Sequence, residues 1–177
     1  SIPQRWAFLR CFIACTLTFA SVLFFNGTAG PQTAAAFDIV QIKMARDMSC
    51  MAGIAAFTIL MFVARYRPQA MRPVALSVSA AVLGLVGHAL SIASGALDVQ
   101  ALLVLGSCAT SVATTWTTVL LLLACSSLSL QRVCVCLAGG AAVVMPLAHI
   151  VGEIGSNAFV SSVDAVASIA VIAMVLP

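Results

Sequence analysis

Residues 101–123, ALLVLGSCATSVATTWTTVLLLL, run for 23 positions without a charged side chain. An α-helix rises about 1.5 Å per residue, so about 20 apolar residues cross the roughly 30 Å hydrocarbon layer of a bilayer. Only helices and closed barrels satisfy every backbone group in lipid, and this run is continuously apolar rather than alternating as a barrel strand is. The stretch therefore predicts a transmembrane helix.

Five further apolar runs have the same character, and short breaks rich in Gly, Pro, Asn and Ser separate them. The chain is 63% hydrophobic and 7% charged, whereas about a quarter of the residues of a soluble domain are charged. We therefore expect an all-α membrane protein, a bundle of six transmembrane helices, with residues 1–177 as a single transmembrane domain and a fragment of a longer protein. The six expected spans are approximately 6–25, 47–64, 73–94, 101–123, 133–151 and 159–176.

The segment before the second span is ambiguous. Between residues 34 and 48, Phe37, Val40, Met44 and Met48 share one side of a helical wheel. This pattern is typical either of a short helix lying in the membrane interface or of an early start to the second span.

The basic residues indicate the orientation of the spans. If the first helix starts in the cytoplasm, six of the eight basic residues fall on the cytoplasmic side, which is the positive-inside distribution. Both termini are then expected to be cytoplasmic. These six residues are Arg5, Arg10, Arg65, Arg67, Arg72 and Arg132.

Ionisable side chains within the spans are costly, since a charge at the centre of a helix adds about 2.5 to 3.5 kcal/mol on insertion scales. Under this orientation His88, His149, Glu153 and Asp164 all lie toward the outer ends of their helices. We expect them to approach one another around an outward-facing cavity, as candidates for a ligand or proton site. The alternative is that each makes an interhelical hydrogen bond.

Hydroxyl groups line one face of the fourth expected span. Ser107, Ser111, Thr114 and Thr118 recur at helical spacing, and they either line a polar pathway or donate hydrogen bonds to their own backbone one turn earlier.

Small residues predict where helices pack closely. The pair at Gly139 and Gly140 is one such place, and a narrow arc of the third span is another. That arc contains Ser77, Gly84, His88, Ser91 and Gly95.

Enzyme and cofactor functions are not indicated. The motifs H-E-x-x-H and G-x-S-x-G and the P-loop do not occur, and the seven cysteines lie in or beside apolar runs, where Cys acts as a small hydrophobic residue. The C-x-C at Cys134 and Cys136 lacks the spacing of a zinc site. Axial haem ligation by His88 and His149 has no further support, so we expect no metal and no cofactor.

The arrangement of helices and loops resembles the amino-terminal half of a major facilitator superfamily protein. The loop at residues 64–73, ARYRPQAMRP, departs from the family's pattern of paired glycines and an Asp. The start of the second span at residues 45–49, ARDMS, followed by an apolar run and Arg65, is similar to the membrane modules that precede a LuxR-type DNA-binding domain in some bacterial regulators.

This resemblance implies the sensory membrane part of a bacterial regulator in the inner membrane, and the alternative is half of a secondary transporter, which binds its substrate near the midplane. The expected partners are the lipid bilayer, the remaining helices or a downstream domain of the same protein, and an unknown small ligand. No nucleic acid is expected to bind through these residues.

Overall fold

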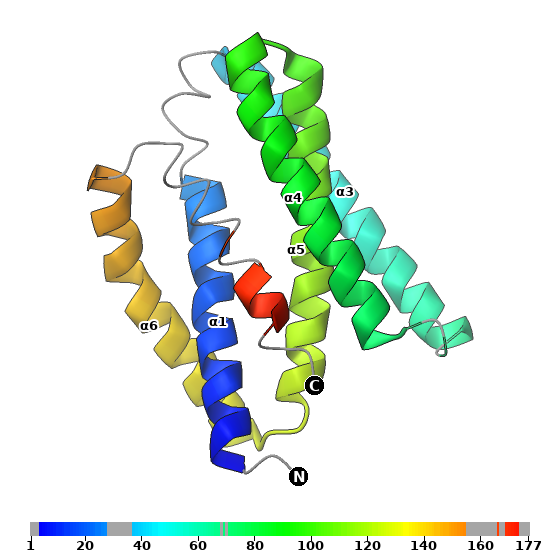
Figure 1. The fold of residues 1–177 in the computed structure, drawn as a ribbon, viewed down its shortest axis with the longest axis vertical. Helices are drawn as coiled ribbons and strands as arrows, with labels where there is room; N and C mark the ends of the chain where they lie inside the picture. Colours follow the sequence, from blue (N-terminus) through cyan, green and yellow to red (C-terminus); the bar gives the residue numbers. More distant parts are fainter. Residues whose placement is uncertain are drawn as a thin grey trace. The chain divides into compact units, whose positions relative to one another are not determined.

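A computed structural model describes residues 4–27, 37–67, 69, 71–154, 166 and 169–173. Within these residues the regular structure is helical and no strand occurs, which confirms the all-α prediction for this part of the chain. Figure 1 shows the long helices. They are α1 (Gln4–Gly27), α3 (Ile39–Tyr66), α4 (Pro73–Leu97), α5 (Gln100–Cys125) and α6 (Leu130–Ile154).

The first five predicted spans each correspond to one of these helices, and every helix extends beyond the predicted bounds at both ends or at one end. The apolar run marks only the part of a helix suited to hydrocarbon, whereas the backbone hydrogen bonds continue into polar residues at the ends. Of the sixth predicted span, 159–176, the described residues are 166 and 169–173, which are helical.

Helix α3 begins at Ile39, eight residues before the predicted span, so the second of the two alternatives for this segment is correct. Asp38 caps the helix: its carboxylate accepts a hydrogen bond from the Ile39 N–H at 2.7 Å, and its own N–H donates to Gln41 Oε1 at 3.0 Å. This reciprocal capping box satisfies backbone donors that otherwise have no partner in the first turn. It therefore fixes the early start.

The described helices pack as two compact units. The first contains α1, the end of α5 from Thr118 onward, α6 and residues 166 and 169–173. The second contains α3, α4 and the part of α5 up to Thr117. The prediction of one transmembrane domain stays a prediction.

In the first unit α1 and α6 lie side by side and run in the same direction (Figure 1). A Cβ added at Gly140 would lie 3.1 Å from the backbone nitrogen of Thr16, and one at Gly139 would lie 2.7 Å from the Phe12 ring. The prediction of close helix packing at these two glycines is confirmed. The buried core here consists of Cys11, Ala14, Cys15, Leu121, Cys125, Cys136 and Val171.

In the second unit the backbones of α4 and α5 approach each other closely at two glycines. A Cβ added at Gly87 would lie 2.9 Å from the carbonyl oxygen of Gly106, and one at Gly106 would lie 2.8 Å from the carbonyl oxygen of Gly87. Both glycines are buried. The predicted packing arc of α4 is therefore right for buried Ser77 and Gly84, but Gly95 is exposed with no atom within 4 Å of an added Cβ.

The outward surface of α3, α4 and α5 is unusually apolar. These three helices are long and apolar enough to cross a membrane, and large hydrophobic side chains such as Ile54, Ile59 and Met61 are exposed by 60% or more. Extensive exposed apolar surface is typical of proteins that contact a partner protein or a membrane. Their length and composition are those of membrane-spanning helices.

Candidate functional site

One of the two candidates from the sequence is the hydroxyl-bearing face of α5. Ser107 is buried and Thr114 is partly buried, with its hydroxyl donating to the Thr110 carbonyl at 2.9 Å. The Thr110 and Thr117 hydroxyls likewise donate to carbonyls of their own helix, to Gly106 at 3.1 Å and to Ala113 at 2.8 Å. For Thr114 this bond is of the kind expected under the second alternative, in which a hydroxyl satisfies its own helix, and Thr110 and Thr117 beside the predicted face do the same.

Ser111 belongs to the contact between α5 and α3. A Cβ added at Gly53 would lie 2.7 Å from the Ser111 hydroxyl oxygen and 3.5 Å from that of Thr115. The absence of a side chain at Gly53 therefore makes room for these two hydroxyls. Thr118 is partly buried and belongs to the first unit, whereas the part of α5 up to Thr117 belongs to the second. A polar pathway along Ser107, Ser111, Thr114 and Thr118 stays a prediction.

The ionisable cluster is described only in part. His88 is partly buried on α4, directly after Gly87 at the contact with α5. Positions 149 and 153 lie one turn apart on α6, after Pro146, but their side chains are outside the described set, and Asp164 is outside it altogether. The proposed approach of His88, His149, Glu153 and Asp164 to one another stays a prediction.

Four thiols lie together in the core of the first unit. Cys125, at the end of α5, lies in one buried cluster with Cys11 and Cys15 of α1 and Cys136 of α6. All seven cysteines are free thiols. Cys134 is exposed although Cys136 is buried, so the two members of the C-x-C face different surroundings. Among the described residues no three His, Cys, Asp or Glu side chains are placed to hold a metal ion.

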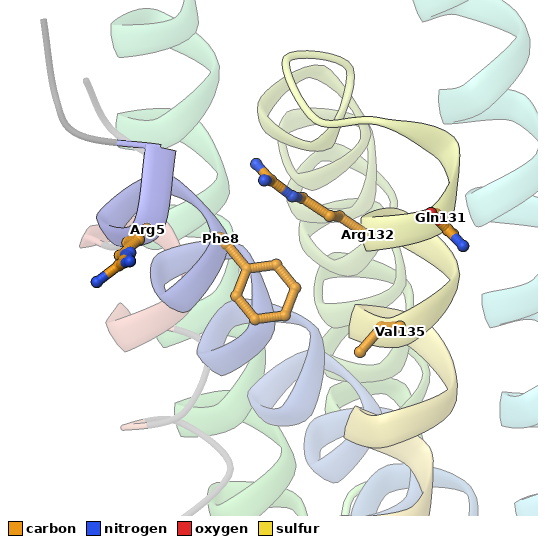
Figure 2. Close-up of a pocket in the computed structure, with 5 residues that line it drawn as sticks. All are labelled: Arg5, Phe8, Gln131, Arg132 and Val135. Atoms are coloured by element: carbon orange, nitrogen blue, oxygen red, sulfur yellow. The ribbon is translucent and has the colours of Figure 1, made fainter.

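A pocket lies where α1 and α6 begin. It has a volume of about 380 Å³ and is lined by Arg5 and Phe8 of α1 and by Gln131, Arg132 and Val135 of α6. Figure 2 shows the Phe8 ring projecting from α1 toward α6 and the Arg132 side chain extending from α6 toward α1.

Sequence reasoning treated Arg5 and Arg132 only as indicators of orientation and did not place them together. Their positions could have indicated that they lie at the same end of the helices, because each arginine is in the first turn of its helix at the end predicted to be cytoplasmic. What the sequence does not contain is the pairing of α1 with α6, which brings positions about 130 residues apart into one pocket.

Comparison with known proteins adds no assignment: no protein family model, curated protein or solved structure matches this chain.

Proposed function

We propose that this chain is a polytopic membrane module with six transmembrane helices and both termini in the cytoplasm, and that it is the sensory part of a regulator in the inner membrane of a bacterium. The observation that carries the membrane assignment is the apolar outer surface of α3, α4 and α5. In water this surface would drive aggregation, whereas in lipid it is solvated by acyl chains.

The packing of α4 against α5 favours a sensor over the amino-terminal half of a major facilitator transporter. A transport route needs polar groups that face a passage. The hydroxyls of Thr110, Thr114 and Thr117 instead donate to carbonyls of α5 itself, and the Gly87 and Gly106 backbones are in contact. This face of α5 is therefore suited to holding helices together.

In this proposal the partners are the lipid bilayer, further helices or a downstream domain of the same protein, and a small ligand held by His88, His149, Glu153 and Asp164. The chain acts without a cofactor, catalyses no reaction and binds no nucleic acid through these residues. Sequencing the complete gene separates the two classes. A helix-turn-helix encoded downstream is expected for the sensor, and a further set of six spans without one would favour the transporter.

The orientation makes a direct prediction about the two ends of α4. Single cysteines are introduced at exposed positions, Gln69→Cys in the basic loop before α4 and Asp98→Cys in the turn after it, with the exposed Cys50 and Cys134 changed to serine. A membrane-impermeant maleimide added to intact cells should label position 98 and leave position 69 unlabelled until the membrane is permeabilised, because arginine-rich loops stay in the cytoplasm. The opposite labelling pattern would invert the proposed topology.

A further inference from the structure

The end of α3 and the start of α4 carry three exposed arginines. Arg65 is in the last turn of α3, Arg67 caps that helix, and Arg72 directly precedes the first residue of α4. Because α4 starts soon after α3 ends, these residues lie at the same end of the second unit (Figure 1). The guanidinium group of arginine offers planar, paired donors that match the oxygens of a phosphate group. This end of the unit therefore has the chemistry to bind a phosphate.

Acidic side chains of α3 and α4 lie far from these arginines. No Asp or Glu occurs from residue 48 to 97. About 27 Å of helix separates Asp47 from Arg65 on α3, and about 39 Å separates Asp98 from Arg72 along α4. The dipole ends of the two helices that meet here are opposite in sign, so the arginines set the sign of the local potential. That potential favours an anion.

Two aromatic rings lie beside the arginines. Phe62 and Tyr66, one turn apart on α3, stack with their ring centroids 6.2 Å apart and an interplanar angle of 10°, and the Arg65 guanidinium carbon lies over the Tyr66 ring at 5.9 Å from its centroid. Both rings are more than half exposed. Tyrosine is enriched where headgroups meet hydrocarbon, and the face of its ring attracts a cation. The surface therefore changes from charged at Arg65 to apolar at Phe62 within one turn of helix.

We propose that Arg65, Arg67 and Arg72 bind the headgroup of an anionic phospholipid of the cytoplasmic leaflet, with an acyl chain of the lipid along Phe62. This inference rests on the proposed membrane location and orientation. Clusters of basic residues beside a span attract anionic lipid, and the exposed aromatic stack favours a lipid over a free phosphate ion, which has no hydrocarbon to place there. A bound lipid would join the end of α3 to the start of α4, because the arginines come from both.

The test uses a tryptophan placed on this surface as the reporter. Tyr66→Trp keeps an aromatic ring beside Arg65, and Trp6→Phe with Trp116→Phe makes it the single tryptophan. The full chain is reconstituted in phosphatidylcholine vesicles with a small share of lipid brominated on its acyl chains, either phosphatidylglycerol or phosphatidylcholine. Bromine quenches tryptophan on contact, and the brominated lipid is present in both leaflets. The ratio of quenching by the two lipids therefore reports the preference of the surface whichever way the chain inserts.

We expect brominated phosphatidylglycerol to be preferred by roughly fivefold, which corresponds to about 1 kcal/mol, the upper end for an exposed ion pair. Arg67→Gln combined with Arg72→Gln should bring this preference close to one, with Arg65 left in place because it contacts the reporter ring. Arg72→Gln alone should lose part of the preference, and it keeps the test decisive if the pair does not fold, because this side chain makes no helix-capping hydrogen bond. The matched control is Lys43→Gln with Arg46→Gln, which removes the same charge from exposed positions near the start of α3 and should leave the preference unchanged.

Three outcomes would overturn the proposal. Equal quenching by the two lipids with all three arginines present would show that the surface does not select anionic lipid, and its charge would then fit an acidic protein segment instead. Loss of the preference on adding inorganic phosphate, but not sodium chloride of equal ionic strength, would identify a site for a soluble anion. An equal loss in the control pair would show that the preference reflects net charge alone. If the chain does not insert into vesicles at all, measured beforehand by flotation, the proposed function fails together with this inference, whereas insertion without selectivity overturns only the inference.

Discussion

Substitution of Ile54 by arginine should prevent much of the protein from inserting into membranes. Ile54 is near the middle of α3 and is 68% exposed, on the surface that we assign to lipid. Arginine at the centre of a transmembrane helix costs about 2.5 to 3.5 kcal/mol on insertion scales, which corresponds to roughly a hundredfold shift in the insertion equilibrium. The measurement is the fraction of the chain that integrates into microsomes and resists alkaline carbonate extraction.

The matched control is the same substitution at Ile39, the first residue of α3, which is 80% exposed. An arginine there can extend its side chain to the interface and should insert almost as well as the unsubstituted chain. In a water-soluble protein both changes would be surface substitutions, with effects within about 0.5 kcal/mol. Equal behaviour of the two variants would therefore contradict the membrane assignment of α3.

Substitution of Gly87 by alanine should destabilise the contact between α4 and α5. The added methyl group would lie 2.6 Å from the Thr110 methyl carbon, 2.8 Å from the Thr110 nitrogen and 2.9 Å from the Gly106 carbonyl oxygen. Two of these three atoms belong to the α5 backbone, so the helices must move apart. Overpacking of this kind costs about 1–3 kcal/mol, and we expect the apparent Tm in detergent to fall by roughly 4–8 °C for a change of about 2 kcal/mol.

Gly95→Ala is the control, since it places the same methyl group on the same helix with no atom within 4 Å. Alanine is a better helix former than glycine by about 1 kcal/mol, so this variant should be as stable as the original or more stable. Gly106→Ala should resemble Gly87→Ala, and the double variant should cost less than the sum because one separation of the helices relieves both clashes. A Gly87→Ala protein as stable as the Gly95→Ala protein would show that the close approach does not exist in solution.

The positions of the helices were predictable from the sequence because a run of apolar residues is a local property. Each described helix overlaps a predicted span, and the limits differ where polar residues continue the helix beyond the apolar run. The sequence leaves the early start of α3 as one of two alternatives, because the pattern of residues 34–48 fits an interfacial helix equally well. The capping hydrogen bonds between Asp38 and Gln41 decide it in the structure.

The contacts between helices were predictable only in part. Gly139 and Gly140 were expected at a close contact and are found at one, whereas Gly95 was expected at one and is exposed. The pairing of Gly87 with Gly106 was not foreseen. The residue type and its hydropathy are the same at all of these positions. What differs is which neighbouring helix, if any, faces each glycine, and the sequence does not contain that information.

The candidate sites were also predictable only in part. The hydroxyl face of α5 was visible from its spacing, but whether its groups face a passage or their own backbone depends on side-chain hydrogen bonds. Arg5 and Arg132 were visible as basic residues near helix ends, but their common pocket depends on α1 lying against α6.

The sequence by itself determined that the chain is helical and apolar enough for membrane spans, because hydrophobic run length and backbone hydrogen bonding act within one segment. The tertiary structure alone decided which faces meet. In lipid the hydrophobic effect does not distinguish one apolar helix face from another, so helices associate through close packing of small residues and through polar contacts. Those interactions depend on distances between residues far apart in the chain, as at Gly87 and Gly106 or at Arg5 and Arg132.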